Sequence, residues 1–312
     1  MIRMFKKSES TQQLLEIKDF VQKSWINLTN PTEEEMKLVS FNTGVPIERM
    51  ALSLDEDERP RVDVDEGNTL IILRIPYEVK GDEIFKVKTI PLGIIITEYY
   101  IITISLFENV VMKDFEIDKV KGFYTTKRTR FLIQILSRTN YYFLKYLDQI
   151  DNEISKIEKR LLKSLRNEEV VKLFELQKAI IYFISSISGN GHVLDAIYKG
   201  KVSKLYKDDE DLLEDIIAEN KQCLEMSTNY GNVLSNTLDA YASVVSNNLN
   251  EVMKFLASLT IIISIPTIIS SLYGMNVELP LQNNPFAFVF VLLFSLLFMI
   301  LTALFFAKKN WL

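Results

Sequence analysis

Two long apolar runs without a charged residue lie near the end of the 312-residue chain. They cover residues 255–276 and 286–307, and only the nine residues 277–285 separate them. Each run exceeds the roughly 20 residues that cross the hydrocarbon core of a bilayer as a helix. We therefore predict a transmembrane hairpin, with a first span at 255–276, a connecting loop at 277–285 and a second span at 286–307.

The lysines around these runs predict how the hairpin is oriented. Lys254 precedes the first run, and Lys308 and Lys309 open a basic tail at 308–312, whereas the loop has no Lys or Arg and carries Glu278. Because cytoplasmic segments carry an excess of Lys and Arg, we expect both termini in the cytoplasm and the loop outside. Residues 1–10 hold no apolar stretch as long as that of a signal peptide. We therefore expect the part of the chain before the first span to stay in the cytoplasm. If several copies of the hairpin surrounded a pore, a ring of loops with Glu278 in each would concentrate cations at its outer mouth.

Composition argues against several other classes of function. Cys223 and His192 are the only cysteine and the only histidine, so we expect neither an internal disulfide nor a thiolate metal cluster. The chain has no phosphate loop, nucleophile elbow or metal-ligand spacing, and we do not expect an enzyme. The net charge of −5 disfavours nucleic acid as a partner.

Residues 1–127 indicate a cytoplasmic domain of mixed α and β structure. Thr32 followed by Glu35 forms a capping box that should open a helix ending near Gly44. Short β-branched and aromatic runs then predict strands at 62–64, 69–75, 84–88, 92–97 and 100–105. The last two runs are almost continuously apolar, which predicts strands covered by helices on both faces.

Residues 128–254 indicate a stalk of long helices. Apolar residues recur at spacings of three and four over 131–165, and a second helix should run over 168–187 until glycines at 189 and 191 kink or end it. A third helix has no terminator from Asp211 to about Leu272, so we expect one continuous rod. Its seam is unusually polar for a dimeric coiled coil, which suits a wider oligomer around water. The seam consists of Leu213, Ile216, Asn220, Cys223, Ser227, Tyr230, Leu234, Thr237, Tyr241, Val244 and Asn248.

Small and hydroxyl residues form one stripe along the first predicted span. They recur at alternating spacings of three and four, while the other faces carry Ile, Leu and Phe. Small residues let membrane helices pack closely, so the stripe could be a packing face. The alternative is that it lines a pore, if several copies turned it to a common axis. The stripe consists of Ala257, Thr260, Ser264, Thr267, Ser271 and Gly274.

Together these features resemble the CorA-type magnesium and cobalt transporter family. The resemblance rests on the order of elements over the whole chain and on the Gly-Met-Asn tripeptide at the end of the first of two C-terminal spans. The matching residues are 250–254 (Asn-Glu-Val-Met-Lys), Pro266 and Thr267, 273–276 (Tyr-Gly-Met-Asn), the acidic loop residue and 308–312 (Lys-Lys-Asn-Trp-Leu).

The resemblance implies a funnel-shaped homopentamer in the plasma membrane of a prokaryote. It implies an α+β cytoplasmic domain, a long stalk helix that continues into the pore helix, and a second span outside the ring. Channel-like uptake of hydrated Mg²⁺, and of Co²⁺ or Ni²⁺, would follow the gradient and the membrane potential. The implied selectivity filter is Gly274, Met275 and Asn276. The implied pore lining is Asn250, Met253, Leu256, Thr260, Ser264, Thr267 and Ser271, with Leu256 in preference to the Ala257 of the stripe.

Regulation by cytoplasmic Mg²⁺ is also implied by the resemblance. Asp239 matches the acid of the family's stalk helix, and Glu78 falls near the acid that would face it from a neighbouring subunit. Asp215 is a further candidate for a regulatory divalent cation. The chain has Glu at position 78 where the family pattern has Asp. Each of the three could instead be an ordinary solvated carboxylate.

Two other functions fit part of the same pattern. One is a zinc transporter of the same fold, coupled to protons, although the intact Gly-Met-Asn tripeptide and the scarcity of His and Cys argue against it. The other is a membrane-anchored coiled-coil scaffold or sensor without transport activity. A helix that only anchors a protein in the membrane does not need its hydroxyl residues on one face. The alignment of Thr260, Ser264, Thr267 and Ser271 therefore argues against this function.

Overall fold

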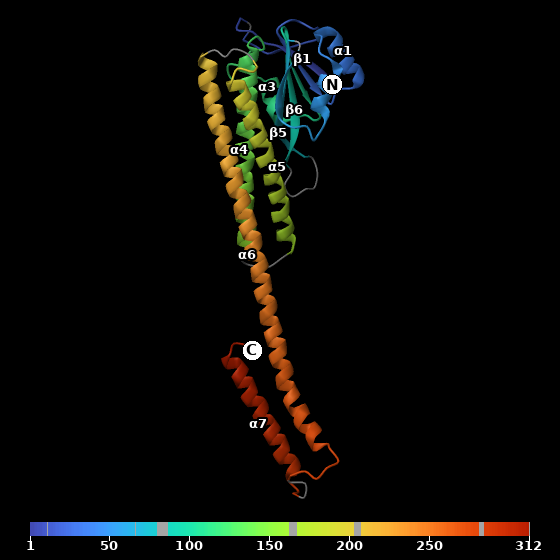
Figure 1. Ribbon diagram of the computed structural model, residues 1–312, viewed down its shortest axis with the longest axis vertical. Helices are drawn as coiled ribbons and strands as arrows, with labels where there is room; N and C mark the ends of the chain where they lie inside the picture. Colours follow the sequence, from blue (N-terminus) through green and yellow to red (C-terminus); the bar gives the residue numbers. More distant parts are fainter. Residues whose placement is uncertain are drawn as a thin grey trace. The chain divides into compact units, whose positions relative to one another are not determined.

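The computed structural model describes residues 1–10, 12–65, 67–79, 87–161, 167–202, 207–280 and 284–311. The chain divides into two compact units, Met1–Thr237 and Leu238–Leu312. The first unit is an α/β domain with long helices, and the second holds the helical hairpin (Figure 1). Helix α6 contributes to both units, since it runs from Lys207 to Tyr273.

The first unit is built on a mixed sheet in the strand order β2-β1-β3-β7-β6-β5-β4. All neighbouring strands are antiparallel except β3 and β7, which pair in parallel from Ser24 opposite Tyr100 to Thr29 opposite Ser105. The sequence predicted two strands at 84–88 and 92–97. In the structure a single strand, β6, runs from Val87 to Ile96 and joins them. Residues 84–86 of the first prediction lie outside the described residues. The strands are β1 (Ile2–Lys6), β2 (Leu15–Ile17), β3 (Ser24–Thr29), β4 (Arg61–Asp65), β5 (Asn68–Glu78), β6 (Val87–Ile96) and β7 (Tyr100–Ser105).

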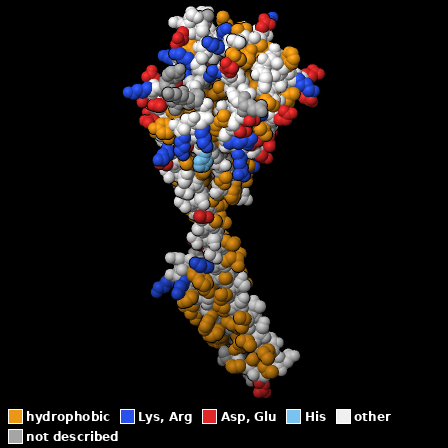
Figure 2. All heavy atoms as spheres, turned by 45° about the horizontal axis from the view of Figure 1, so that its top comes forward, with side chains coloured by type: hydrophobic (Ala, Val, Ile, Leu, Met, Phe, Trp, Pro, Cys, Tyr) orange, Lys and Arg blue, Asp and Glu red, His pale blue; other side chains and the backbone are white. Residues whose placement is uncertain are grey.

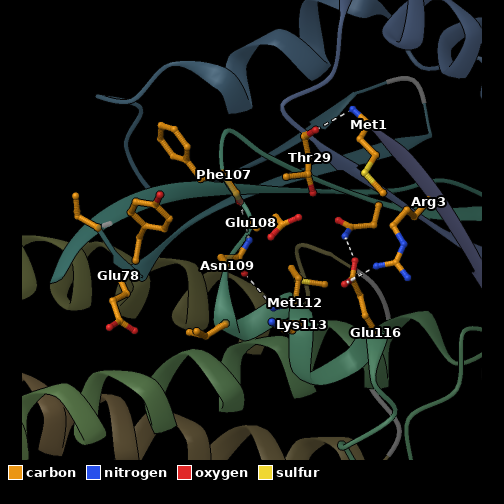
Figure 3. A pocket seen from close by; sticks show the side chains of 14 residues that line it. Met1, Arg3, Thr29, Glu78, Phe107, Glu108, Asn109, Met112, Lys113 and Glu116 are labelled. Carbon is orange, nitrogen blue, oxygen red and sulfur yellow. Dashed lines mark hydrogen bonds and ion pairs between the residues drawn. The ribbon is translucent and has the colours of Figure 1, made fainter. Parts of the chain in front are cut away.

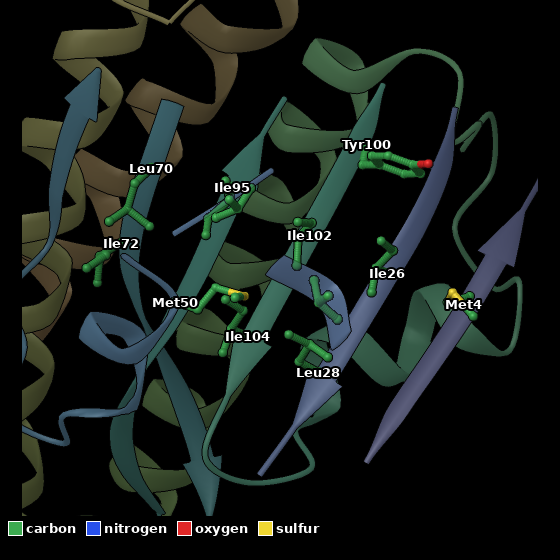
Figure 4. Packing of buried hydrophobic residues seen from close by; sticks show 12 residues of the cluster. Met4, Ile26, Leu28, Met50, Leu70, Ile72, Ile95, Tyr100, Ile102 and Ile104 are labelled. Carbon is green, nitrogen blue, oxygen red and sulfur yellow. The ribbon is translucent and has the colours of Figure 1, made fainter. Parts of the chain in front are cut away.

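One face of the sheet is covered by the short helices α1 (Glu33–Thr43) and α2 (Ile47–Ala51) and the 3-10 turn η1 (Leu52–Leu54). Val39 and Met50 from these helices join alternate strand residues such as Ile102 in one buried cluster (Figure 4). Thr32 and Glu35 form the capping box, and Gly44 ends α1 in the left-handed conformation with φ of 73°. The helix predicted here is therefore confirmed.

The other face of the sheet is covered by α3 (Val110–Glu116) and by the helices that follow it. Trp25 of β3 is fully buried on this side. Its ring lies 6.5 Å from Phe115 of α3, 6.0 Å from Phe123 and 5.3 Å from Phe131. Both faces of β7 are thus buried, as its continuous apolar run predicted.

Three helices continue from this side of the sheet: α4 (Arg128–Leu161), α5 (Asn167–Tyr198) and α6 (Lys207–Tyr273). Helices α4 and α6 run parallel, since hydrogen bonds join Arg130 to Asp209, Asn140 to Ile216 and Glu158 to Thr237. Leu213, Cys223 and Leu234 of the polar seam are buried within this unit. The interpretation of this seam as packed around water in a wider oligomer is therefore wrong for this stretch.

The glycines at 189 and 191 do not end α5, which continues to Tyr198. A Cβ on Gly189 would lie 2.7 Å from Cγ of Pro60, and one on Gly191 would lie 3.0 Å from Oδ1 of Asn220. Between them, Asn190 Nδ2 donates to the Arg74 carbonyl at 2.7 Å and its Oδ1 accepts from the Arg74 amide at 2.9 Å. The glycines therefore permit close approach to neighbouring elements, and Asn190 satisfies the backbone of β5.

In the described part of the chain, two helices are long and apolar enough to cross a membrane, and their apolar segments lie in the second unit. These are the C-terminal part of α6 and the whole of α7 (Ala287–Lys308). Helix α6 is continuous through Pro266, as expected from the absence of a terminator in the sequence. The α+β domain, the long helix and the C-terminal helical hairpin predicted from the sequence are all present.

Candidate ion pathway

The small and hydroxyl residues of the first span lie on one side of α6. Thr260, Thr267 and Ser271 are exposed in the single chain, and Ser264 is half-buried. At about 3.6 residues per turn, these positions fall within one stripe that continues past the end of the helix toward Gly274. Ala257 and Leu256 border the stripe on either side, and both are exposed.

A different face of α6 is covered within the hairpin. Ser258 is fully buried, and Ile262, Ile265 and Ile269 are partly buried at spacings of three and four. On α7, the most buried side chains are Ser295 and Phe306, each 8% exposed, and they belong to the face that meets α6. The Ser258 hydroxyl lies 3.3 Å from the carbonyl oxygen of Trp311, which follows α7. Thr260 and Thr267 sit about half a turn away from this covered face, so the stripe is not where α6 packs on α7.

The hydroxyl hydrogens of the stripe are used inside α6. Thr260 Oγ1 donates to the Leu256 carbonyl at 2.8 Å, Ser264 Oγ to the Thr260 carbonyl at 2.7 Å, and Thr267 Oγ1 to the Ile263 carbonyl at 3.3 Å. A hydroxyl that has given its one hydrogen to the backbone retains oxygen lone pairs. The stripe therefore presents hydrogen-bond acceptors along an otherwise apolar span.

The Gly-Met-Asn tripeptide forms the turn that follows α6. The Gly274 amide donates to the Ser270 carbonyl at 3.0 Å, and the Met275 amide to the Leu272 carbonyl at 3.4 Å. A Cβ on Gly274 would lie 3.3 Å from the Ser270 oxygen, which explains a small residue here. All three residues are exposed, and so is Glu278 in the loop. The C-terminal end of a helix carries negative partial charge, so this turn is a favourable place for a cation.

The other end of the stripe is apolar. Met253 is 58% exposed and Leu256 is 49% exposed, and Asn250 lies one turn before Met253. These two large exposed side chains, one turn apart, form an apolar patch at this end of the stripe.

Comparison with known proteins bears on this arrangement. A family model described as CorA-like Mg²⁺ transporter protein matches residues 22–309. The chain belongs to this family. The cobalt/magnesium transport protein CorA of Methanocaldococcus jannaschii is 28% identical over 303 residues, which are 92% of this chain and 90% of that protein. The Thermotoga maritima CorA is 24% identical over 316 residues, which are 98% of this chain and 88% of that protein.

The fold agrees with the family. The complete structure of the CorA magnesium transporter from M. jannaschii superimposes with a TM-score of 0.87 at 26% identity, covering 100% of this chain and 99% of that one. The resemblance inferred from the Gly-Met-Asn tripeptide and the order of elements is confirmed, and the chain is a member of a family of Mg²⁺ and Co²⁺ transporters. Its two apolar helices fit a two-span membrane protein.

The three acidic residues suggested as regulatory sites of this CorA-like chain are all exposed. Glu78 ends β5 and Asp215 lies on α6 in the first unit, whereas Asp239 lies on α6 in the second. Among the described residues, no three His, Cys, Asp or Glu side chains gather as they would around a metal ion.

Two of these acids influence neighbouring groups. Burial raises the pKa of Tyr146 to about 12, and the charge of Glu78 adds to the shift. Burial also raises the pKa of Glu219, and Asp215, one turn earlier on α6, adds to that shift. Asp215 and Glu219 thus form a pair of like charges on one helix face, which binding of a divalent cation would relieve.

Glu78 also lines a hollow of the first unit with a volume of about 930 Å³. Figure 3 shows Glu78 at one end of this hollow and the ion pair of Arg3 with Glu116 at the other. Arg3 Nη1 lies 2.8 Å from Glu116, which also accepts a hydrogen bond of 2.8 Å from Asn27. The charges at that end are paired with each other, and Glu78 and Glu108 are the other carboxylates that line the hollow.

The single cysteine is structural. Cys223 is fully buried, and burial raises the pKa of its thiol to about 12. Its Sγ lies 3.8 Å from the Asn140 carbonyl, whereas His192 on α5 is exposed. A thiol with so high a pKa stays protonated and unreactive at neutral pH.

Proposed function

We propose that this chain mediates the uptake of Mg²⁺, and secondarily of Co²⁺, through a pore formed by several copies of α6. The observation that carries the proposal is the hydroxyl stripe, which lies about half a turn from the face that packs on α7. A homopentamer in a prokaryotic plasma membrane, with both termini cytoplasmic, is the arrangement that the family suggests. In such a ring the stripe would turn to the common axis and α7 would lie outside.

The chemistry of the stripe suits a hydrated ion. Mg²⁺ holds its water ligands tightly and demands near-ideal octahedral geometry, so fast passage favours transport with the waters in place. Those waters point their hydrogens outward, and the lone pairs of Thr260, Ser264 and Thr267 would accept them. Hydroxyl contacts are also weak enough to let the ion leave, as conduction requires.

The turn after α6 would form the selectivity filter. A ring of Asn276 amides and Gly274 carbonyls, with Met275 between them, would accept hydrogen bonds from the water shell. Such a ring would bind the ion less tightly than a ring of carboxylates, so the ion could leave. The C-terminal ends of several α6 helices would add negative potential at the same place. Glu278 in each loop would raise the local cation concentration at the outer mouth.

The cytoplasmic end of the pathway would be closed by apolar side chains. Rings of Met253 and Leu256 would form a constriction that excludes water and ions when narrow, as hydrophobic gates do. Asn250, one turn further into the cytoplasm, would offer amide oxygens to an ion approaching or leaving that constriction. Ser271 would continue the polar lining toward the filter.

Cytoplasmic Mg²⁺ would regulate the pore at the interfaces between subunits. We assign this role to Asp239 and Glu78, each from a different copy, and with less support to Asp215. Bound Mg²⁺ would neutralise carboxylates that otherwise repel each other and would hold the ring closed. Loss of the ion at low cytoplasmic Mg²⁺ would free the subunits to move.

The test is Mg²⁺ flux into proteoliposomes that carry the purified full-length protein. Cobalt hexammine, which mimics hydrated Mg²⁺, should block this flux if the waters stay on during passage. Flux of Zn²⁺ driven by a pH gradient, without flux of Mg²⁺, would replace the proposal by a zinc transporter. Absence of flux for every divalent cation at any internal Mg²⁺ or voltage would leave a scaffold without transport activity.

A further inference from the structure

Helix α6 leaves the other helices of the first unit near residue 237. Leu234 is fully buried and Thr237 is half-buried, whereas every residue from 242 to 257 is exposed. That exposed stretch has only two charged residues, Glu251 and Lys254, and Figure 2 shows few charged side chains along it on the face drawn. Few ion pairs could therefore hold this part of α6 in one orientation.

The Thr237 hydroxyl makes the last hydrogen bond between α6 and α4 in the described part of the chain. It donates to Oε1 of Glu158, a half-buried residue of α4, at 3.0 Å. Six other hydroxyls of α6 donate to the carbonyl four residues earlier in their own helix. These are Ser227, Thr228, Ser243, Thr260, Ser264 and Thr267. The Thr237 hydroxyl therefore joins two helices, whereas these six bond within one.

Glu158 is a strong acceptor for this hydrogen bond. Among the described residues, no lysine or arginine forms an ion pair with its carboxylate. A hydrogen bond to an ionised acceptor is stronger than one between neutral groups. The negative charge of Glu158 is thus directed to Thr237 at the point where α6 leaves α4.

Holding Thr237 also sets the direction of Asp239. Successive residues of an α-helix are about 100° apart around its axis, so Asp239 lies about 200° from Thr237. That is the side of α6 opposite Glu158, and Asp239 is indeed exposed. Its carbonyl accepts from the Ser243 hydroxyl at 3.0 Å, as in a regular helix. With Thr237 turned to α4, the Asp239 carboxylate points away from its own helix bundle.

We infer that Glu158 is a positioning residue for the sensing of cytoplasmic Mg²⁺. Through Thr237 it fixes the rotation of α6, so that Asp239 is presented to a neighbouring copy before the ion binds. A carboxylate that is already oriented binds a cation at a lower ordering cost than one that must first be fixed. This inference rests on the proposed role of Asp239 as a sensor, and adds to it a residue that does not touch the ion.

Mg²⁺ flux into proteoliposomes carrying the full-length protein tests the effect on sensing. Thr237→Val and Glu158→Ala should each raise the internal Mg²⁺ concentration that halves the flux by about fivefold, the effect of one lost hydrogen bond. Thr237→Ser and Glu158→Gln keep a donor or an acceptor and should restore the wild-type value. Flux at low internal Mg²⁺ should be the same in all four variants, because neither residue lies on the hydroxyl stripe.

Two further variants show whether the effect passes through Asp239. Thr237→Val should add no shift to that of Asp239→Asn, since both variants weaken the same ligand. Thr228→Val removes an exposed hydroxyl that donates to the Leu224 carbonyl at 2.8 Å within α6. This control should leave the Mg²⁺ dependence unchanged.

Amide hydrogen exchange of the detergent-solubilised protein gives a second measurement that does not depend on transport. Thr237→Val should speed exchange in residues 238–250 and leave residues 131–150 of α4 unchanged, because local opening reports local loss of contacts. Faster exchange throughout α4 would show an ordinary stabilising contact and overturn the inference.

The two parts of the account can fail separately. Wild-type flux that falls with internal Mg²⁺, together with an unchanged half-inhibiting concentration in Thr237→Val and Glu158→Ala, would overturn the role of Glu158 and leave the sensor in place. Wild-type flux that does not respond to internal Mg²⁺ would reject the sensor itself, and the positioning role with it.

Discussion

The Ser264 hydroxyl donates to the Thr260 carbonyl at 2.7 Å, and the Thr260 hydroxyl donates in turn to the Leu256 carbonyl at 2.8 Å. Because both hydrogens are taken up within α6, both oxygens offer only lone pairs to whatever lies beside the stripe. A hydrated cation presents the complementary groups, namely water hydrogens. The proposed conduction mechanism depends on this relationship.

Removing these acceptors should slow transport. The variant Thr260→Val/Thr267→Val keeps the side-chain volume and the apolar surroundings but deletes two hydroxyl oxygens. With about 1 kcal/mol for each lost hydrogen bond, Mg²⁺ flux should fall by at least about fivefold. The measurement is initial uptake into proteoliposomes at matched protein density.

Thr302→Val on α7 is the matched control for this experiment. Thr302 Oγ1 donates to the Phe298 carbonyl at 2.8 Å, so the variant loses the same kind of hydrogen bond within the other span. Its flux should equal that of the wild-type protein. An equal loss of flux in both variants would mean that helix stability, and not the pathway, was affected.

The filter assignment makes a stronger prediction. Asn276→Ala should abolish selective Mg²⁺ uptake and its block by cobalt hexammine, while the oligomer measured by light scattering in detergent remains intact. Asn248→Ala, an exposed amide on α6 away from the stripe, should leave uptake unchanged. Normal uptake by Asn276→Ala would remove Asn276 from the filter.

The sensor assignment concerns cytoplasmic Mg²⁺. Asp239→Asn should raise the internal Mg²⁺ concentration that halves the flux by about tenfold, equivalent to roughly 1.4 kcal/mol of lost binding. Asp239→Lys should instead lower the flux even at low internal Mg²⁺, because a lysine at this position would pair with Glu78 of a neighbouring copy and hold the ring closed. Asp211→Asn, another exposed acid of α6, should have no effect. An unchanged Mg²⁺ response in both Asp239 variants would exclude Asp239 from the sensor.

Local signals explain which parts of the fold were predictable from the sequence. Thr32, Glu35 and Gly44 specify the start and the end of α1 by contacts within a few residues, so that helix was predicted with its caps. The uncharged runs and the absence of a terminator after Asp211 gave the continuous α6 and the hairpin for a similar reason. Length and composition alone are enough to specify a span.

Features that depend on distant partners were not predictable in this way. Strand β3 includes Ser24 and Asn27 in buried positions, and Asn27 is hydrogen-bonded to Thr103 and Glu116, which are distant in sequence. Helix α5 continues through residue 190, where Asn190 forms hydrogen bonds with the backbone of Arg74. These two residues are 116 positions apart in the sequence. No local pattern contains that information.

The polar seam of α6 was misinterpreted for the same reason. Its polarity indicated contact with water in a wide oligomer, but its first half is buried within the first unit. The Asn220 amide lies 3.3 Å from Oδ1 of Asn140 and the Asn140 amide donates to the Ile216 carbonyl at 2.9 Å. Candidate site residues such as Asn276, in contrast, were identified from the Gly-Met-Asn motif. Its position at the end of the first of two C-terminal spans indicates the family without any knowledge of distant contacts.

Glu219 gives a prediction about pH and stability. Burial and the charge of Asp215 raise its pKa in the folded protein, so ionised Glu219 lowers stability at neutral pH. This cost sets in as pH rises from the ordinary pKa of a glutamate through the raised folded value. Glu219→Gln should therefore raise the unfolding midpoint by a few degrees at pH 7, and by nothing below about pH 4.

Trp25 fluorescence during heating of the detergent-solubilised protein measures this midpoint. Glu225→Gln, an exposed acid of the same helix, is the control and should change the midpoint at neither pH. A midpoint for Glu219→Gln that is lower than wild type at pH 7 would show that the carboxylate makes a favourable contact, contrary to its raised pKa.

Cysteine substitution tests most directly whether the hydroxyl stripe lines the pathway. Cys223 is buried with a pKa of about 12, so it should not react and single cysteines can be introduced into the natural chain. Proteoliposomes carrying Ser264→Cys, Thr267→Cys or Thr302→Cys would be treated with a small cationic methanethiosulfonate reagent during Mg²⁺ flux. The account predicts block of flux in the two stripe variants and none in Thr302→Cys. Unimpeded flux through both modified stripe variants, or equal block through Thr302→Cys, would contradict it.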